Sequence, residues 1–339
     1  MSGESKSRLE ILWRNSTMAI VHIGLSCYDQ FFFIESTPAE NVKTFSTQFL
    51  ESGGGPAGNA AYVTGKWKTP TYILTTLRDD IYGRKINQEH NEVGVNTNFV
   101  IMNDNQVSPL SAVWVSAQTA ARTIVTHKNN GAKVLTAEDY SLLNDLADKL
   151  NAEEGTHIIL LDGHELEISK YFIPRVHNKI VVIDADAVRE PVLELLYLVD
   201  YCVASEEFAQ RLINETDLHP GNFARALEAM EKLCAPGNKP VITLGERGGV
   251  YLDDGLMHAY PAYDVRAVDT TGAGDIFHGA FCYGVAQGWD LAKTVRVAAL
   301  TSAIKIEQQG VRNAIPEIEF VLEAYEKKSF PVKALDTIN

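Results

Sequence analysis

Short, nearly continuous apolar runs recur along the chain, and each ends in a small or acidic residue. Runs without polar alternation are typical of strands buried on both faces, as in a parallel sheet. Helix-period segments lie between them, so the pattern predicts an α/β fold with a doubly wound, mostly parallel sheet flanked by helices. The predicted strands are AIVHIGL, TYILTTL, HIILLDG, KIVVIDAD, DYCVAS and PVITLG, and the predicted helices cover 138–150, 205–213, 222–233, 273–287 and 291–306.

Two stretches interrupt this alternation and predict a small β-sheet lid. The first begins with QFFFIESTPAENVKTF. In the second, SPLSAVWVSAQTAARTIVTHKNNG, a turn-like SAQTA separates two β-rich segments, which predicts a hairpin. We place the lid segments at about 29–52 and 108–130, within a single domain at 18–330 that no repeat or linker divides. Residues 1–17, before the first apolar run, are predicted to be a flexible tail.

Composition narrows the classes of function. The 339 residues are 45% hydrophobic and 22% charged, which is typical of a globular protein. Lys and Arg total 30 against 44 Asp and Glu, giving a net charge of −14 without a basic run, so we expect no nucleic-acid partner. No stretch approaches the ~20 apolar residues of a membrane helix, and the start lacks a secretion signal. We therefore expect a cytoplasmic protein with no membrane partner.

The segment VDTTGAGDIFHGAF carries the strongest chemical signal. Thr270 and Thr271 are good N-cap residues, and the following glycines allow a tight turn before an apolar helix. A helix start of this kind presents free N–H groups and a positive dipole end to an anion. Asp275 lies in the first turn, so one segment offers an anion cradle and a proton acceptor, as phosphoryl transfer to a hydroxyl requires. The alternative is an ordinary first-turn acid after a glycine loop.

A second glycine-rich segment, SGGGPAGNAAY, lies near the start of the domain. It does not fit a P-loop, because Ala60 and Trp67 occupy the positions of the required Gly and Ser/Thr around Lys66. Its glycines also fail to match GxGxxG, which leaves a dinucleotide fold as a weak alternative.

Together, SGGGPAGNAAY and VDTTGAGDIFHGAF resemble the paired signature of the PfkB, or ribokinase-like, carbohydrate kinases. Further matching segments lie in register: GLSCYD before the two motifs, TLRDDIYGRK, RTIVTH and VITLGERGG between them, and GVRNAIP after them. The resemblance therefore covers about 18–316. It implies a ribokinase-like fold and ATP-dependent phosphorylation of a hydroxyl, expected to be primary, on a small sugar or sugar derivative, with Mg²⁺. A nucleoside kinase of the same fold and a non-catalytic regulator that binds a sugar or nucleotide stay open as alternatives.

The resemblance also implies roles for individual residues. Asp275 matches the catalytic base, and the preceding residues match the anion hole. Arg122, in the predicted hairpin, has forked donors suited to a phosphate, although a solvated arginine is an equal alternative. Taken alone, Asn59 would be read as a helix N-cap and Asp29 as a strand-end turn. The candidates are Gly272, Ala273 and Gly274 for the anion hole, Asp29, Gly54, Gly55, Asn59 and Arg122 for the sugar, and Ser205, Thr243, Gly245, Gly248, Gly272 and Gly274 for the nucleotide.

The chain departs from the family at the Asn-x-x-Glu motif, where Ser205 and Phe208 stand in the Asn and Glu positions. Glu206 is then the candidate for contacting Mg²⁺ through water. The Ser-Glu-x-Phe form resembles the branch that contains ketohexokinases and sulfofructose kinases, although Pro56 and Ala121 replace typical ketohexokinase asparagines, which argues against a plain fructose pocket.

The resemblance further suggests two binding features away from the sugar. Asp269 and Thr271 are candidates for a monovalent cation, K⁺. Lid sheets in the family often pair between subunits, and the aromatic run QFFFIES is hard to bury in a small isolated sheet, so we expect a homodimer through the lid.

Overall fold

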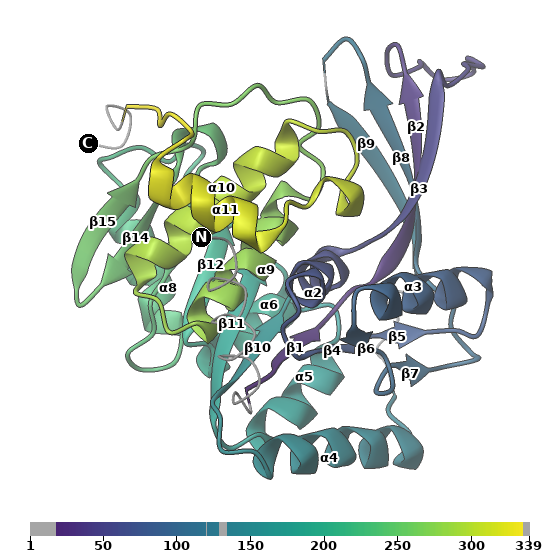
Figure 1. The fold of residues 1–339 in the computed structure, drawn as a ribbon, viewed down its shortest axis with the longest axis vertical. Helices are drawn as coiled ribbons and strands as arrows, with labels where there is room; N and C mark the ends of the chain where they lie inside the picture. The colour runs from purple at the N-terminus through teal and green to yellow at the C-terminus, as the bar shows by residue number, and fades with distance from the viewer. Residues whose placement is uncertain (1–17, 120, 129–133, 335–339) are drawn as a thin grey trace, which may run out of the picture.

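A computed structural model describes residues 18–119, 121–128 and 134–334, so the predicted tail at 1–17 lies outside the described residues. A nine-stranded sheet forms the centre of the molecule, in the order β15-β14-β13-β12-β11-β10-β1-β4-β6 (Figure 1). The strands from β13 to β6 are parallel, and β14 and β15 extend the sheet as an antiparallel hairpin. The strands are β1 (Ile20–Ile23), β4 (Thr71–Leu74), β6 (Val95–Asn96), β10 (His157–Leu161), β11 (Lys179–Ala185), β12 (Tyr201–Ser205), β13 (Val241–Thr243), β14 (Gly249–Asp253) and β15 (Leu256–Tyr260).

Helices cover both faces of this sheet, as the non-alternating strands predict. Neighbouring strand residues point to opposite faces, and Ile158 and Ile159 accordingly belong to two different hydrophobic cores. One core includes side chains of α4 (Ala137–Asn151), α5 (Leu166–Phe172), α6 (Glu190–Leu195), α7 (Glu206–Leu212) and α8 (Phe223–Leu233). The other includes side chains of α2 (Pro56–Lys66), α9 (Ala273–Ala286), α10 (Leu291–Ile306) and α11 (Ile318–Lys327). The predicted doubly wound fold is confirmed.

A smaller four-stranded sheet projects from the large one (Figure 1). It has the order β3-β2-β8-β9 and consists of β2 (Cys27–Ile34), β3 (Gln48–Gly54), β8 (Leu110–Ser116) and β9 (Arg122–His127). β8 and β9 form the predicted antiparallel hairpin, with Val113 opposite Ile124. Across the sheet, Ser52, Asp29, Ser111 and Thr126 are register neighbours. Cross-strand neighbours share a face, so the Asp29 carboxylate lies in a polar row.

The remaining elements join the two sheets and complete the helical layers. α3 (Ile81–Glu92) begins at Asp80, whose carboxylate caps the helix, and it lies beside β2 and β3 (Figure 1). The short elements are β5 (Thr76–Leu77) paired with β7 (Ile101–Met102), and the 3-10 turns η1 (Ile173–Arg175), η2 (Leu196–Leu198), η3 (Gly245–Arg247) and η4 (Arg312–Ala314).

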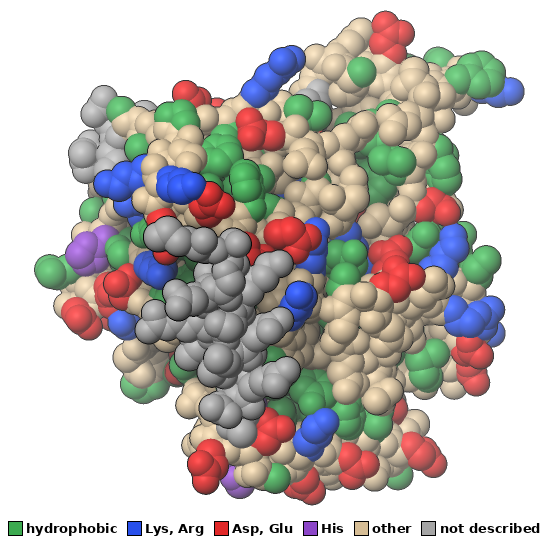
Figure 2. All heavy atoms as spheres, viewed as in Figure 1, with side chains coloured by type: hydrophobic (Ala, Val, Ile, Leu, Met, Phe, Trp, Pro, Cys, Tyr) green, Lys and Arg blue, Asp and Glu red, His purple; other side chains and the backbone are tan. Residues whose placement is uncertain are grey.

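The structure also describes the distribution of charged side chains on one face and the state of the four cysteines. Acidic and basic side chains are scattered over the face shown in Figure 2 rather than gathered into one basic patch. Within the described part of the chain, no helix is long and apolar enough to span a membrane. Cys27, Cys202, Cys234 and Cys282 are all free thiols.

Candidate active site

The start of α9 is a tight turn at Gly272, which adopts the left-handed conformation with φ of 70°. A Cβ atom at this position would lie 2.7 Å from Cγ1 of Val311, so the turn requires glycine. Thr270 and Thr271 were predicted as N-caps, and this is wrong, because Gly272 is the N-cap residue and has no side chain. Gly272 therefore offers no side-chain acceptor to the first N–H groups of α9, and these groups have no acceptor within the helix.

Asp275 is joined to Asn59 at the centre of the molecule. The Asn59 amide Nδ2 donates to Asp275 Oδ2 over 2.7 Å, and its Oδ1 accepts from Nε of Arg312 over 3.3 Å. Arg312 is 3% exposed, and its Nη1 donates to Glu89 Oε2 over 2.8 Å. This network fixes which end of the Asn59 amide faces the aspartate. Asn59 lies inside α2 rather than at its start, so the alternative interpretation as a helix N-cap is wrong.

The environment makes Asp275 a better proton acceptor than a free aspartate. Burial raises the pKa of the Asp275 carboxyl, while the hydrogen bond from Asn59 lowers it in part. Burial likewise raises the pKa of Asp29, and the negative charge of Asp275 adds to that rise. The negative charge of Asp275 thus acts on the Asp29 carboxyl.

The predicted sugar residues gather around Asp29. Asp29 is 9% exposed, and its Oδ1 accepts from Sγ of Cys27 over 3.1 Å. A Cβ atom on Gly54 would lie 1.9 Å from Asp29 Oδ2, so only glycine permits this approach of β3 to the carboxylate. Gly55 follows as the N-cap residue of α2. The structure therefore brings Asp29, Gly54, Gly55 and Asn59 together, and Asn59 connects this group to Asp275.

Two cations, one on β9 and one just after it, contact residues outside the smaller sheet. Nη1 of Arg122, the first residue of β9, donates to Oγ1 of Thr270 over 3.1 Å, beside the Gly272 turn. Nζ of Lys128 lies 2.9 Å from Nδ1 of His164, which follows β10. Positive charge is thereby placed beside the Gly272 turn and beside the segment that follows β10.

A cavity of about 500 Å³ lies on the other side of the Gly272 turn. The predicted nucleotide residues Thr243, Gly245, Gly248 and Gly274 line it, together with Ala273. Its remaining wall is largely apolar and includes Tyr260, Val265, Phe277, Ala299 and Ile306. An apolar cavity beside a helix N-terminus suits a ligand with a flat ring at one end and an anionic group at the other.

Ser205 and Glu206 lie outside this cavity lining. The Ser205 hydroxyl caps α7 by accepting from the N–H of Phe208 over 3.1 Å, and it donates to the carbonyl of Asp186 over 2.6 Å. Glu206 pairs with Arg247 over 2.6 Å. In the described residues no three His, Cys, Asp or Glu side chains form a group able to hold a metal ion.

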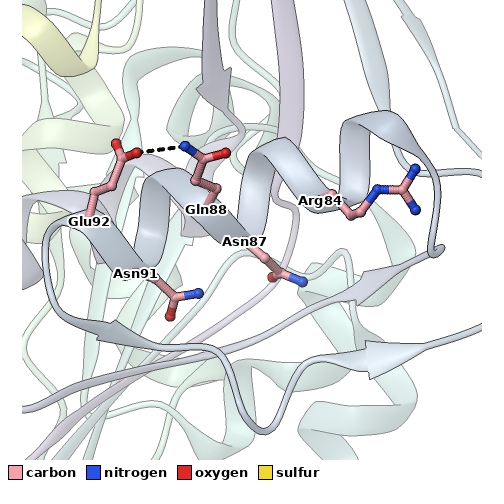
Figure 3. Close-up of a pocket in the computed structure, with 5 residues that line it drawn as sticks. All are labelled: Arg84, Asn87, Gln88, Asn91 and Glu92. Atoms are coloured by element: carbon pink, nitrogen blue, oxygen red, sulfur yellow. Dashed lines mark hydrogen bonds between the residues drawn. The ribbon is translucent and has the colours of Figure 1, made fainter.

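A further pocket lies on the outer face of α3 and contains none of the predicted residues. Arg84, Asn87, Gln88, Asn91 and Glu92 line it, and Figure 3 shows Gln88 donating to Glu92 along the helix, over 2.9 Å. All five come from one helix, and we assign no role to this pocket.

Comparison with known proteins identifies the class. The family described as pfkB family carbohydrate kinase matches residues 18–318, and the chain belongs to this family of carbohydrate kinases. It is 26% identical over 306 residues to a deoxyribokinase of Salmonella typhi, covering 89% of this chain and 97% of the relative. It is also 26% identical over 313 residues to a ribokinase of Staphylococcus aureus, covering 90% and 99%.

Solved structures confirm the ribokinase-like fold. The ribokinase of Giardia lamblia superimposes with a TM-score of 0.79 at 21% identity, covering 92% of this chain and 100% of the other. An Arabidopsis thaliana ribokinase complexed with ribose and ATP gives a TM-score of 0.72 at 20% identity, covering 91% and 98%. The resemblance to the family is thus confirmed, while the ketohexokinase and sulfofructose kinase branch stays a prediction.

Glu89 and Arg312 join the network of the candidate site and were not predicted from the sequence. They lie 223 positions apart, and neither has a local pattern that marks it. The only signal was the segment GVRNAIP, which contains Arg312 and was noted for its resemblance alone.

We predict that Glu89→Ala destabilises the fold. Arg312 is 3% exposed, and the substitution leaves its charge unpaired, which should lower the free energy of unfolding by about 3 kcal/mol. The N–H of Gly53 also loses its acceptor, Glu89 Oε2. Urea denaturation measures the change. Glu92→Ala, on the exposed side of the same helix, is the control and should cost under about 0.5 kcal/mol; equal effects of the two substitutions would contradict the assignment.

Proposed function

We propose that the protein transfers the terminal phosphoryl group of ATP to a primary hydroxyl of a small sugar of the ribose or deoxyribose class. The observation that carries this proposal is the position of Asp275. Its carboxylate accepts a hydrogen bond from Asn59, and it lies in the first turn of the helix whose residues Ala273 and Gly274 line the cavity. The named relatives, which are a deoxyribokinase and ribokinases, support the sugar class. The Arabidopsis ribokinase complex with ribose and ATP supports the nucleotide.

In this proposal Asp275 takes the proton of the attacking hydroxyl. Its raised pKa brings it closer to the range in which a carboxylate both stays ionised and accepts a proton effectively. The N–H groups at the start of α9, from Gly272 to Asp275, stabilise the charge on the transferring phosphoryl oxygens. Asp29 and Asn59 orient the sugar through its other hydroxyls, because a carboxylate accepts hydrogen bonds and an amide both donates and accepts them.

The nucleotide would occupy the cavity lined by Thr243, Gly245 and Gly248, with its phosphates directed toward Gly274. Mg²⁺ would neutralise phosphate charge there, held by phosphate oxygens and water, with Glu206 as the candidate that contacts this water shell. The four-stranded sheet would act as the lid, since it supplies both Asp29 and Arg122. Closing it would exclude water from the transferring group.

The direct test is product formation. Phosphorus NMR of the protein with ATP, Mg²⁺ and a panel of pentoses, deoxypentoses and ketohexoses should show a sugar phosphate. Asp275→Asn should reduce turnover by about 10²- to 10⁴-fold while nucleotide binding is retained, because a general base is lost without a change of size. Asp145→Asn, on the exposed side of α4, is the matched control and should leave turnover unchanged.

Three other outcomes would change the proposed function or its mechanism. Adenosine or inosine that outcompetes every sugar would indicate a nucleoside kinase of the same fold. Ligand binding with no phosphorylated product from any member of the panel would indicate a non-catalytic regulator. An Asp275→Asn variant with wild-type turnover would remove Asp275 as the base.

We predict that Asn59→Ala moves the acidic limb of the pH–kcat profile to higher pH. The hydrogen bond from Asn59 favours the ionised form of Asp275, so its loss raises the pKa of this carboxyl further. A base acts only when deprotonated. As the pH is lowered, the activity of the variant would therefore begin to fall at a higher pH than that of the wild type. Gln88→Ala, which removes an amide-to-carboxylate bond outside the site, is the control. An unshifted acidic limb in Asn59→Ala would contradict this coupling.

We also propose a homodimer formed through the projecting sheet. Phe32, Phe49 and Trp114 are register neighbours on one face, and the Phe32 and Phe49 rings lie 5.1 Å apart. Val125 extends this face on β9 and is 60% exposed. An exposed apolar sheet face of this kind favours pairing with a second copy.

Light scattering tests the dimer. The wild-type protein should have the mass of two chains at micromolar concentration, and Phe49→Glu should shift it to one chain, because a buried unpaired charge opposes association. Val134→Glu, which places the same charge at an exposed position outside the sheet, is the control. A wild-type protein that stays monomeric would exclude this interface.

A further inference from the structure

Lys305 is a buried cation directly beneath the active-site turn. It lies in the last turn of α10 and has no exposed surface. Its Nζ donates to the carbonyl of Asp269 over 2.9 Å and to the carbonyl of Thr271. These backbone oxygens belong to the segment just before Gly272, the N-cap residue of α9. The Lys305 ammonium therefore ties the end of one helix to the start of the next.

The Asp269 side chain is engaged elsewhere. Its Oδ1 accepts from the N–H of Thr271 and its Oδ2 accepts from the N–H of Gly310, each over 2.9 Å. Within the described residues Lys305 forms no ion pair with a carboxylate, so its charge is balanced by carbonyl dipoles. Proteins also bind monovalent cations with backbone carbonyl oxygens, which replace the hydration shell of the ion.

The carbonyls of Asp269 and Thr271 therefore do not fit the K⁺ site that the family resemblance suggested. The Lys305 ammonium already lies against both, and two cations at one set of oxygens would repel each other. Burial lowers the pKa of Lys305 to about 8, with Asp269 and Asp275 opposing the shift and Arg122 adding to it. The amine is thus mainly protonated near pH 7.

A second contact supports a positioning role for this part of α10. The Ser302 hydroxyl, one turn before Lys305, donates to the carbonyl of Ala273 over 2.8 Å. Lys305 and Ser302 together hold the carbonyls on both sides of Gly272. A displacement of about 1 Å at such a turn can reduce the reaction rate about a hundredfold. By anchoring the turn, the two side chains keep its N–H groups in position.

We propose that Lys305 is a positioning residue that replaces a bound monovalent cation, so that phosphoryl transfer by this kinase is independent of K⁺. The proposal rests on the proposed kinase function, because it concerns the turn that would hold the transferring phosphoryl group.

The first test compares cations at constant ionic strength. Sugar-dependent phosphoryl transfer by the wild-type protein is measured in choline chloride, KCl and NH₄Cl, and the rates should be equal.

Lys305→Ala should lose about a hundredfold in kcat, and K⁺ or NH₄⁺ should restore part of it, since the shortened side chain leaves room at the two carbonyls. Lys305→Met, whose apolar chain fills that space, should be as impaired and not rescued. Lys293→Ala, a lysine of the same helix away from the turn, should behave as wild type.

Stimulation of the wild-type protein by K⁺ would overturn the proposal, as would equal responses of Lys305→Ala and Lys305→Met to the cations.

Thermal stability gives a readout that does not need activity. K⁺ should raise the Tm of Lys305→Ala above its value in choline, and it should leave the Tm of the wild type unchanged. A protein inactive toward every sugar would thus refute the proposed function while the Tm comparison still decides the role of Lys305. If Lys305→Ala does not fold in choline but folds in K⁺, the proposal is supported; if it folds in neither, while Lys305→Met folds and is fully active, the proposal is overturned.

Discussion

The hydrogen bond between Asn59 and Asp275 is the contact on which the site depends. It joins α2 and α9, whose residues are 216 positions apart in the chain, at the carboxyl end of the sheet. Through Asn59 the aspartate is connected to Arg312, and through Arg312 to Glu89 on α3. A carboxylate held in this way keeps one orientation, and burial raises its pKa without leaving it unpaired. Orientation and basicity therefore have a common structural origin.

The Gly272 turn separates the two halves of the site. Asp29, Gly54 and Asn59 lie toward the smaller sheet, and the large cavity opens on the side of Gly274. In the proposed reaction, the group transferred between ligands on these two sides would pass the N–H groups of the turn. Lys305 and Ser302 hold the adjacent carbonyls from α10, so the position of these N–H groups is set by helix packing rather than by the loop alone.

The order of strands and helices could be predicted from the sequence, because buried strands and helices leave local patterns. The candidate site residues were expected from the glycine-rich motifs and the family resemblance. Apolar runs marked the buried strands, and Gly272 to Asp275 marked the helix start. Thr270 and Thr271 were misjudged as caps because glycine in a left-handed turn took the N-cap position instead, a choice decided by packing against Val311. Lys305 has the local pattern of an ordinary last-turn lysine. Its burial, like the Glu89 to Arg312 pair, depends on contacts between distant segments.

The most direct test of the account is a crystal structure of the protein with ribose or deoxyribose and a non-hydrolysable ATP analogue. The account predicts the analogue in the cavity beside Gly248, its terminal phosphate against the N–H groups of Gly274 and Asp275, and a sugar hydroxyl bonded to the Asp275 carboxylate between Asp29 and that phosphate. A sugar bound away from Asp275, or a terminal phosphate directed away from the start of α9, would contradict it.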